Sequence, residues 1–176
     1  MAGQNLYHIA SSTERLDSII KFLSSGRERK VDILLCDKCN AAGVKAWAQV
    51  NPEQPKVGYT YKEHLKTATQ GFLDLISDVR KQKISGLNIR VLGLVPFSAT
   101  VIDPSLKSRI MTIQPVVNHG PKSGDRPQFL ITNNQDDVFT YYWLNLQTAF
   151  EFATDLEKAS MVGMRKTVRR RVKPKA

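Results

Sequence analysis

The sequence predicts an α/β fold: a mixed, mainly parallel sheet covered by helices on both faces, with an antiparallel extension. The N-terminal half alternates helix and strand twice, and the second strand is a nearly continuous apolar run. Such runs are typical of parallel strands covered on both faces. Beyond Pro96, short strands follow one another without helices between them, which indicates antiparallel pairing.

The first unit is a helix over residues 11–25 followed by a strand over residues 31–37. Ser11 stands where a helix cap is expected, and Glu14 completes a capping-box pattern. Four apolar residues then follow helical spacing: Leu16, Ile19, Ile20 and Leu23. The next run, VDILLCD, is short and begins with a β-branched residue, which favours a buried strand.

The second unit is a long helix over residues 61–82 and a strand over residues 87–97. The helix carries one apolar stripe: Leu65, Ala68, Phe72, Leu75, Ile76 and Val79. Its basic end and Gly86 supply stop signals. The strand LNIRVLGLVPF is expected to be the most buried strand in the chain.

The remaining elements are three short strands and one helix. The strands are expected around residues 99–103, 109–117 and 127–132, and the helix over residues 138–159. Its aromatic and apolar stripe is Phe139, Tyr142, Trp143, Leu146, Phe150 and Ala153. A sheet-covering helix needs such spacing, so core packing is favoured over a ligand platform.

Charge is distributed unevenly along the chain. The net charge is +10, from 26 basic and 16 acidic residues. Seven basic residues and no acid lie in the last twelve positions: Arg165, Lys166, Arg169, Arg170, Arg171, Lys173 and Lys175. We therefore predict a single α/β domain over residues 1–160 and a basic, disordered segment over residues 161–176.

Several classes of protein are excluded or disfavoured by the sequence. No apolar run approaches the roughly 18 residues that cross a bilayer, and the N-terminus lacks the pattern of a secretory signal. We therefore expect a cytoplasmic protein without a transmembrane segment. The phosphate-binding patterns GxxxxGK(S/T) and GxGxxG are absent, as is the GxSxG nucleophile elbow, so no cofactor is expected.

The loop NHGPKSGDRP, residues 118–127, places His119, Lys122 and Asp125 close together. Glycines and prolines surround these side chains, and such a turn is a poor platform for catalysis. A solvated loop is favoured, and closure over an anionic ligand is the alternative.

Two cysteines form a CxxC pattern at the end of the predicted strand 31–37. Cys36 and Cys39 there suggest redox chemistry or half of a zinc site. A structural zinc site usually takes four ligands, and no second Cys or His pair stands at the usual spacing. Incidental strand-end cysteines are the favoured interpretation, and a metal site is the weaker alternative.

Two carboxylates, Asp37 and Asp103, follow predicted strands. Ligands of α/β folds commonly bind at the carboxyl edge of the sheet, so both are candidates for an anion site there together with His119 and Lys122. Helix caps or turn formers are the favoured interpretation of these aspartates.

The stretches LNIRVLGLVP, TVIDPS, DRPQFLIT and DVFTYYWLNLQTAFEFA, in this order, resemble small bacterial regulatory or effector domains related to the phospholipase D superfamily. That resemblance covers roughly residues 10–155. The superfamily's enzymes carry HxK followed by an aspartate four residues later. Here His119 and Lys122 are separated by two residues, so the resemblance implies a degenerate scaffold without its nucleophile.

These observations predict a non-catalytic binding or regulatory module whose basic segment engages nucleic acid or another polyanion, since clustered Arg and Lys bind phosphates. The alternative is a small enzyme that processes a phosphodiester or a nucleotide at the carboxyl edge of the sheet. A protein partner or a homo-oligomer is a further expectation.

Overall fold

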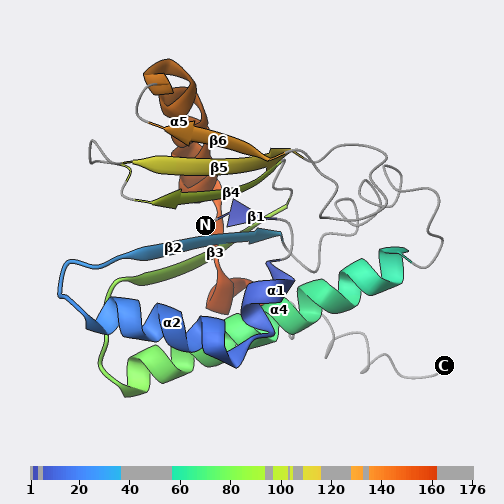
Figure 1. The fold of residues 1–176 in the computed structure, drawn as a ribbon. Coiled ribbons are helices and arrows are strands. Elements are labelled where there is room, and N and C mark those ends of the chain that lie inside the picture. The colour runs from blue at the N-terminus through green and yellow to red at the C-terminus, as the bar shows by residue number, and fades with distance from the viewer. Residues whose placement is uncertain are drawn as a thin grey trace.

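The computed structural model of the chain describes residues 2–3, 6–36, 57–93, 97–102, 104, 109–115, 128–132 and 135–161. Figure 1 shows the strands β2 and β3 above a layer of helices, with β4, β5 and β6 continuing the sheet. No described helix combines the length and the apolar character that a bilayer-spanning segment requires. The α/β class predicted from the sequence is present.

The seven described strands form one sheet in the order β6-β5-β4-β1-β2-β3-β7. The strands are β1 (Ala2–Gly3), β2 (Val31–Cys36), β3 (Leu87–Leu92), β4 (Phe97–Ile102), β5 (Ile110–Pro115), β6 (Phe129–Thr132) and β7 (Thr154–Asp155). β1, β2 and β3 are parallel, and β2 is in register with β3 from Val31 opposite Leu87 to Cys36 opposite Leu92. One residue pair, Ala2 with Ala99, joins this parallel part to the antiparallel part.

Three helices cover the parallel strands on one face: α1 (Tyr7–Ala10), α2 (Thr13–Ser24) and α4 (Val57–Lys81). The apolar side of α4 is buried as predicted, with Phe72 fully enclosed and Leu75 nearly so. It packs with Ile33 and Ile89 of the sheet in one apolar cluster. Both crossovers between parallel strands therefore lie on the same face, as right-handed connections between strands added in one direction require.

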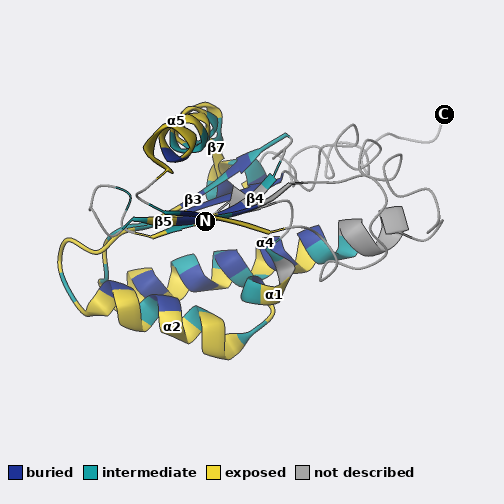
Figure 2. Ribbon diagram, turned by 45° about the horizontal axis from the view of Figure 1, so that its top comes forward, coloured by how far each residue is buried: buried dark blue, intermediate teal, exposed yellow. Residues whose placement is uncertain are grey.

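The helix α5 (Asp136–Phe152) lies across the opposite face of the sheet (Figure 2). Its predicted stripe faces the strands: Phe139 is completely buried with Met111 and Ile113, and Tyr142 and Trp143 pack against the same cluster. Phe150 and Ala153 pack around Leu34 and Cys36. The interpretation of this aromatic stripe as a docking face is confirmed.

The expectation of a mainly parallel sheet covered on both faces is not confirmed. Two of the described strand pairings are parallel and four are antiparallel. The four are β4 with β5 and β5 with β6, which form a meander, together with β1 with β4 and β3 with β7. In the meander, the side chains that point away from α5 stay accessible. Ile102 is 54% exposed, Ile110 39% and Leu130 62%.

Three local predictions need correction. The cap of α2 is Ser12, whose hydroxyl accepts the N–H of Arg15 at 3.4 Å, because α1 precedes it and places Ser11 in the intervening turn. The most buried described strand is β2. In β3, buried and half-buried residues alternate, and this strand lies one strand from the sheet edge. The last long helix ends at Phe152, since Ala153 is extended and leads into β7.

Candidate functional site

Several chain segments begin or end at the carboxyl edge of the parallel strands. β2 ends there at Cys36 and β3 ends there at Leu92. Because β4 runs antiparallel to β1, its first residue lies at this edge, and the end of β5 lies there too. Two further segments therefore start from the same edge. One contains Asp37 and Cys39, and the other contains His119 and Lys122. All four of these residues lie outside the described residues.

Asp103 follows the end of β4, at the other edge of the sheet. Ile102 pairs with Ile110, where the β4–β5 connection begins, so this connection leaves from the amino edge of the parallel strands. Asp103 itself is outside the described residues. The strand topology attaches its segment at the opposite edge from the segment with Asp37, because β4 runs in the opposite direction to β2.

Cys36 is the described half of the CxxC pattern. It is 4% exposed and lies in an apolar cluster with Leu34 and Leu65, which α5 covers. Within the described ranges, no group of three or more His, Cys, Asp or Glu side chains could hold a metal ion. The surroundings of Cys36 are those of a core residue.

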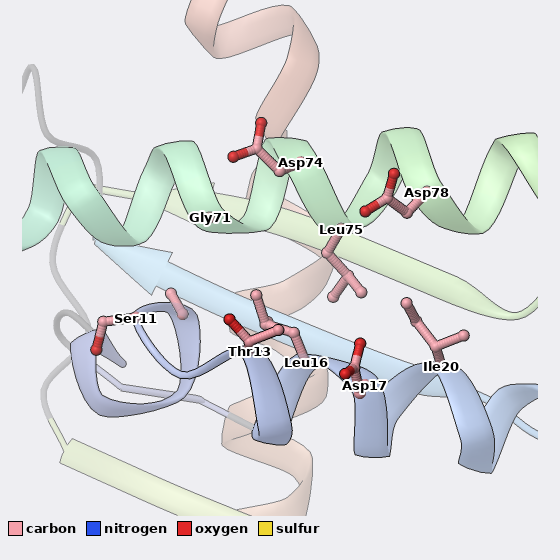
Figure 3. Close-up of a pocket in the computed structure, with 10 residues that line it drawn as sticks. Ser11, Thr13, Leu16, Asp17, Ile20, Gly71, Asp74, Leu75 and Asp78 are labelled. Carbon is pink, nitrogen blue, oxygen red and sulfur yellow. The ribbon is translucent and has the colours of Figure 1, made fainter.

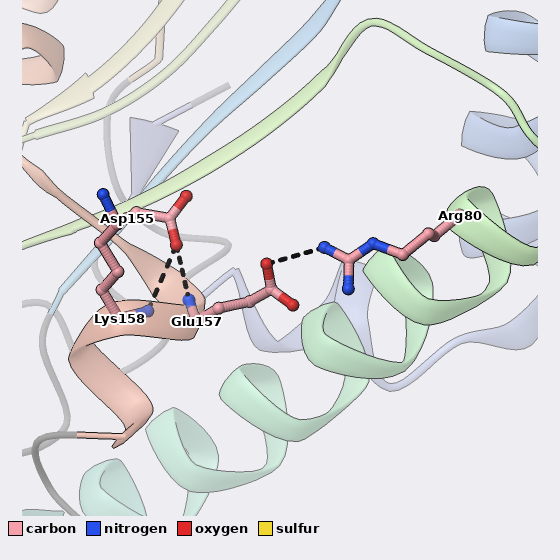
Figure 4. Close-up of polar contacts among 4 residues, drawn as sticks. All are labelled: Arg80, Asp155, Glu157 and Lys158. Carbon is pink, nitrogen blue, oxygen red and sulfur yellow. Dashed lines mark hydrogen bonds and ion pairs between the residues drawn. The ribbon is translucent and has the colours of Figure 1, made fainter.

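A polar cleft of about 520 Å³ opens beside the edge of β3, between α4 and the segment that begins at β7. Its polar lining includes Arg80, Asn88, Asp155, Glu157 and Lys158. The Asp155 carboxylate accepts the backbone N–H groups of Glu157 at 3.0 Å and Lys158 at 3.3 Å (Figure 4). That is N-cap geometry, so Asp155 starts the helix over residues 156–161.

One ion pair joins this helix to α4. The Arg80 guanidinium donates to a Glu157 carboxylate oxygen at 2.9 Å, as Figure 4 shows. The hydrogen bond with Glu157, and then its charge, raise the pKa of Arg80 above its ordinary value. An arginine side chain is always protonated in proteins, so Arg80 contributes a constant positive charge to this contact.

The helix over residues 156–161 is also held by packing. Leu156 is 1% exposed and Ala159 packs on the same core cluster as α2 and α4. Arg90 borders the cleft, and its guanidinium is already engaged by the carbonyl of Phe150 at 2.9 Å and by the ring of Phe150, 4.6 Å from its centroid. The helix over residues 156–161, which precedes the basic segment in the chain, is therefore held against the fold by Leu156 and Ala159.

A second groove, of about 300 Å³, lies between α4 and the α1–α2 pair (Figure 3). Three carboxylates border it: Asp17, Asp74 and Asp78. Asp74 accepts a hydrogen bond from Gln70 at 2.9 Å, and Asp78 pairs with Lys81 at 3.2 Å. This groove is acidic and disfavours an anionic ligand.

The separate helix over residues 156–161, which precedes the basic segment, was not predicted from the sequence. The signal for it is the string TDLEKAS, in which Asp155 precedes helix-forming residues in the manner of a cap. The predicted basic residues from Arg165 to Lys175 lie outside the described residues. Compared with known proteins, the chain matches no protein-family model, no curated protein and no solved structure.

Proposed function

We propose that the protein is a binding module, without catalytic activity of its own, whose basic segment contacts nucleic acid. The observation that carries this proposal is the concentration of charge: seven basic residues and no acid within residues 165–176, directly after the fixed helix. The rest of the chain has 19 basic and 16 acidic residues, so most of the charge excess resides in this segment.

The physical basis is release of counterions from phosphates. Each Lys or Arg that neutralises a phosphate displaces condensed cations, which gives affinity that falls steeply as salt rises. Contacts of this kind position a protein on a nucleic acid without reading its sequence. The helix over residues 156–161 precedes this segment in the chain and packs on the described fold through Leu156 and Ala159.

Fluorescence anisotropy tests this proposal. The full chain and a chain ending at Gly163 are titrated into labelled duplex DNA, single-stranded DNA and RNA at two salt concentrations. We expect salt-sensitive binding that becomes much weaker and less dependent on salt on truncation. A full-length variant with all seven basic residues of the segment changed to Gln separates charge from length, and wild-type affinity in that variant would refute the proposal.

A second candidate is an enzyme that acts on a phosphodiester or a nucleotide. The supporting observation is that the segments with Asp37 and with His119 and Lys122 start from one edge of the sheet. A turnover screen with phosphodiester and nucleotide substrates tests it. Activity that His119→Ala and Asp37→Asn both abolish, with unchanged melting temperatures, would favour this candidate over the binding module.

A further inference from the structure

A second concentration of positive charge lies on two turns of the described fold. Two turns, each counted with the last turn of the helix before it, together carry seven basic and two acidic residues: residues 21–30 between α2 and β2, and residues 78–86 between α4 and β3. Outside these turns, residues 1–164 carry 12 basic and 14 acidic residues. The positive excess of the body therefore resides in the two turns, which we call the turn surface.

The two turns lie side by side, although about fifty residues of chain separate them. The N–H of Val31 donates to the carbonyl of Gly86 at 2.8 Å, and β2 pairs with β3 from this point onward. A Cβ on residue 86 would lie 2.1 Å from the carbonyl oxygen of Arg29. Figures 1 and 2 show both turns at the same end of the molecule, where most of their residues are exposed.

Several cations of the turn surface have no ionic partner in the described part of the fold. Arg27, Lys30 and Lys83 are exposed, and no ion pair joins them to a carboxylate among the described residues. Lys81 pairs with Asp78, and Arg80 pairs with Glu157. Arg27, Lys30 and Lys83 are therefore available to an external anion.

Lys83 occupies a position that favours glycine. The N–H of Lys83 donates to the carbonyl of Arg80 and the N–H of Ile84 to that of Val79, both at 3.0 Å. These two bonds define a Schellman motif that ends α4, and Lys83 has the left-handed backbone, with φ of 56°, at the position where glycine is usual. A lysine at this position costs conformational energy that glycine would not.

Helix stability accounts for only part of the turn surface. Cations in the last turn of a helix interact favourably with its carbonyls, and this explains Lys21, Arg80 and Lys81. It does not explain Arg27 and Lys30, which lie beyond the end of α2, nor does it require a lysine in place of glycine at residue 83. The contacts of the described fold therefore do not account for a lysine at residue 83.

We infer that the turn surface is a second contact site for the phosphate backbone of nucleic acid, with Arg27, Lys30 and Lys83 as its principal cations. This inference rests on the proposed function and extends it from the basic segment to the fold. The ion pair between Arg80 and Glu157 places the base of that segment beside the last turn of α4, three residues before Lys83. One polyanion can therefore engage both surfaces.

The turn surface fits nucleic acid better than a lipid surface. Peripheral binding to a membrane needs apolar side chains that enter the interface, together with basic groups. The large apolar side chain exposed on these two turns is Phe22, at 42%, and the guanidinium of Arg29 stands over its ring, 5.1 Å from the centroid. Cations without an apolar wedge are typical of phosphate contacts.

The test compares substitutions at Lys83 in the full chain. Lys83→Gly relieves the backbone strain and removes the charge, whereas Lys83→Arg keeps the charge. Lys66→Gln removes an exposed charge of α4 outside the turn surface and is the control; Lys66 pairs with Glu63 at 3.7 Å. We expect Lys83→Gly to melt at a higher temperature and to bind labelled DNA and RNA about fivefold more weakly at roughly 0.15 M salt, as removal of one cation from the phosphate backbone implies.

The combination of higher stability and weaker binding separates a contact residue from a structural one. Lys83→Arg should bind like the wild type, and adding Arg27→Gln and Lys30→Gln to Lys83→Gly should lower affinity further. Equal affinity of Lys83→Gly and Lys66→Gln would overturn the inference, as would binding to vesicles of phosphatidylserine in place of nucleic acid. The same substitutions in the chain ending at Gly163 distinguish the two proposals, because the turn surface is then measured without the basic segment.

Discussion

The backbone N–H of Val31 donates a 2.8 Å hydrogen bond to the carbonyl oxygen of Gly86, and this bond starts the pairing of β2 with β3. Gly86 has φ of 91°, a conformation that residues with a Cβ rarely adopt. Both the conformation of Gly86 and its close approach to Arg29 fix how the two basic turns lie together. The geometry of the turn surface therefore depends on a residue without a side chain.

Replacing Gly86 by alanine is expected to destabilise the protein by more than about 2 kcal/mol, because the new Cβ would be strained and would meet backbone atoms of Arg29. Urea denaturation measures this change. Gly26→Ala is the control, since its Cβ would make ordinary contact, at 3.5 Å, with a flexible side chain. A change within about 0.5 kcal/mol for both variants would contradict the close approach.

Lys83→Gly is expected to raise the free energy of unfolding by about 0.5 to 1 kcal/mol, since glycine adopts the left-handed conformation without a steric penalty. Part of the gain is offset because glycine makes the unfolded chain more flexible. Denaturation of wild type, Lys83→Gly and Lys83→Ala side by side checks this. Equal stability of all three would show that residue 83 is not held in the left-handed region.

Gly71 lets α1 approach α4 closely. A Cβ there would lie 2.3 Å from the carbonyl oxygen of Ala10, so Gly71→Ala should push α1 away and cost about 1 to 3 kcal/mol. Alanine has a better helix propensity than glycine, so a helix that is free at this point would become more stable instead. The sign of the change in thermal melting temperature decides between these two outcomes.

Ser160 has a buried hydroxyl group that makes no hydrogen bond among the described residues. Ser160→Ala removes this unsatisfied group and should stabilise the fold by about 1 kcal/mol. The buried Thr69 hydroxyl, by contrast, donates to the Leu65 carbonyl at 2.7 Å, so Thr69→Val should cost about 0.5 to 1.5 kcal/mol. Opposite signs in a denaturation experiment are expected, and a decrease in the stability of Ser160→Ala would contradict this account.

The longer helices, the strands β2 to β6 and the antiparallel pairing of the last three of these strands were predictable from the sequence, whereas the two short strands β1 and β7 were not. The stripes on α2, α4 and α5 follow from local periodicity, which every residue of the helix reinforces. β1 spans Ala2–Gly3 and β7 spans Thr154–Asp155, and two residues carry no periodic signal. Their places beside β2 and β3 depend on contacts between distant parts of the chain. Whether a helix covers a given face of the meander also depends on such contacts, so the exposure of Leu130 could not be predicted from the sequence.

The candidate site shows the same division. The charge of residues 165–176 was evident because it lies in one continuous stretch. The turn surface was not, since Arg29 and Gly86 belong to different units and approach each other only through the pairing of β2 with β3. The strain at Lys83 was hidden as well, because it is a property of the backbone conformation, which the residue type does not reveal.

The most direct test of the central claim is the dependence of nucleic-acid affinity on salt, measured for the full chain and for the chain ending at Gly163. If the basic segment neutralises phosphates, the slope of log K against log salt becomes less steep on truncation by about 0.7 to 0.9 for each phosphate that the shorter chain no longer neutralises. A slope that is the same for both chains would contradict the proposed function.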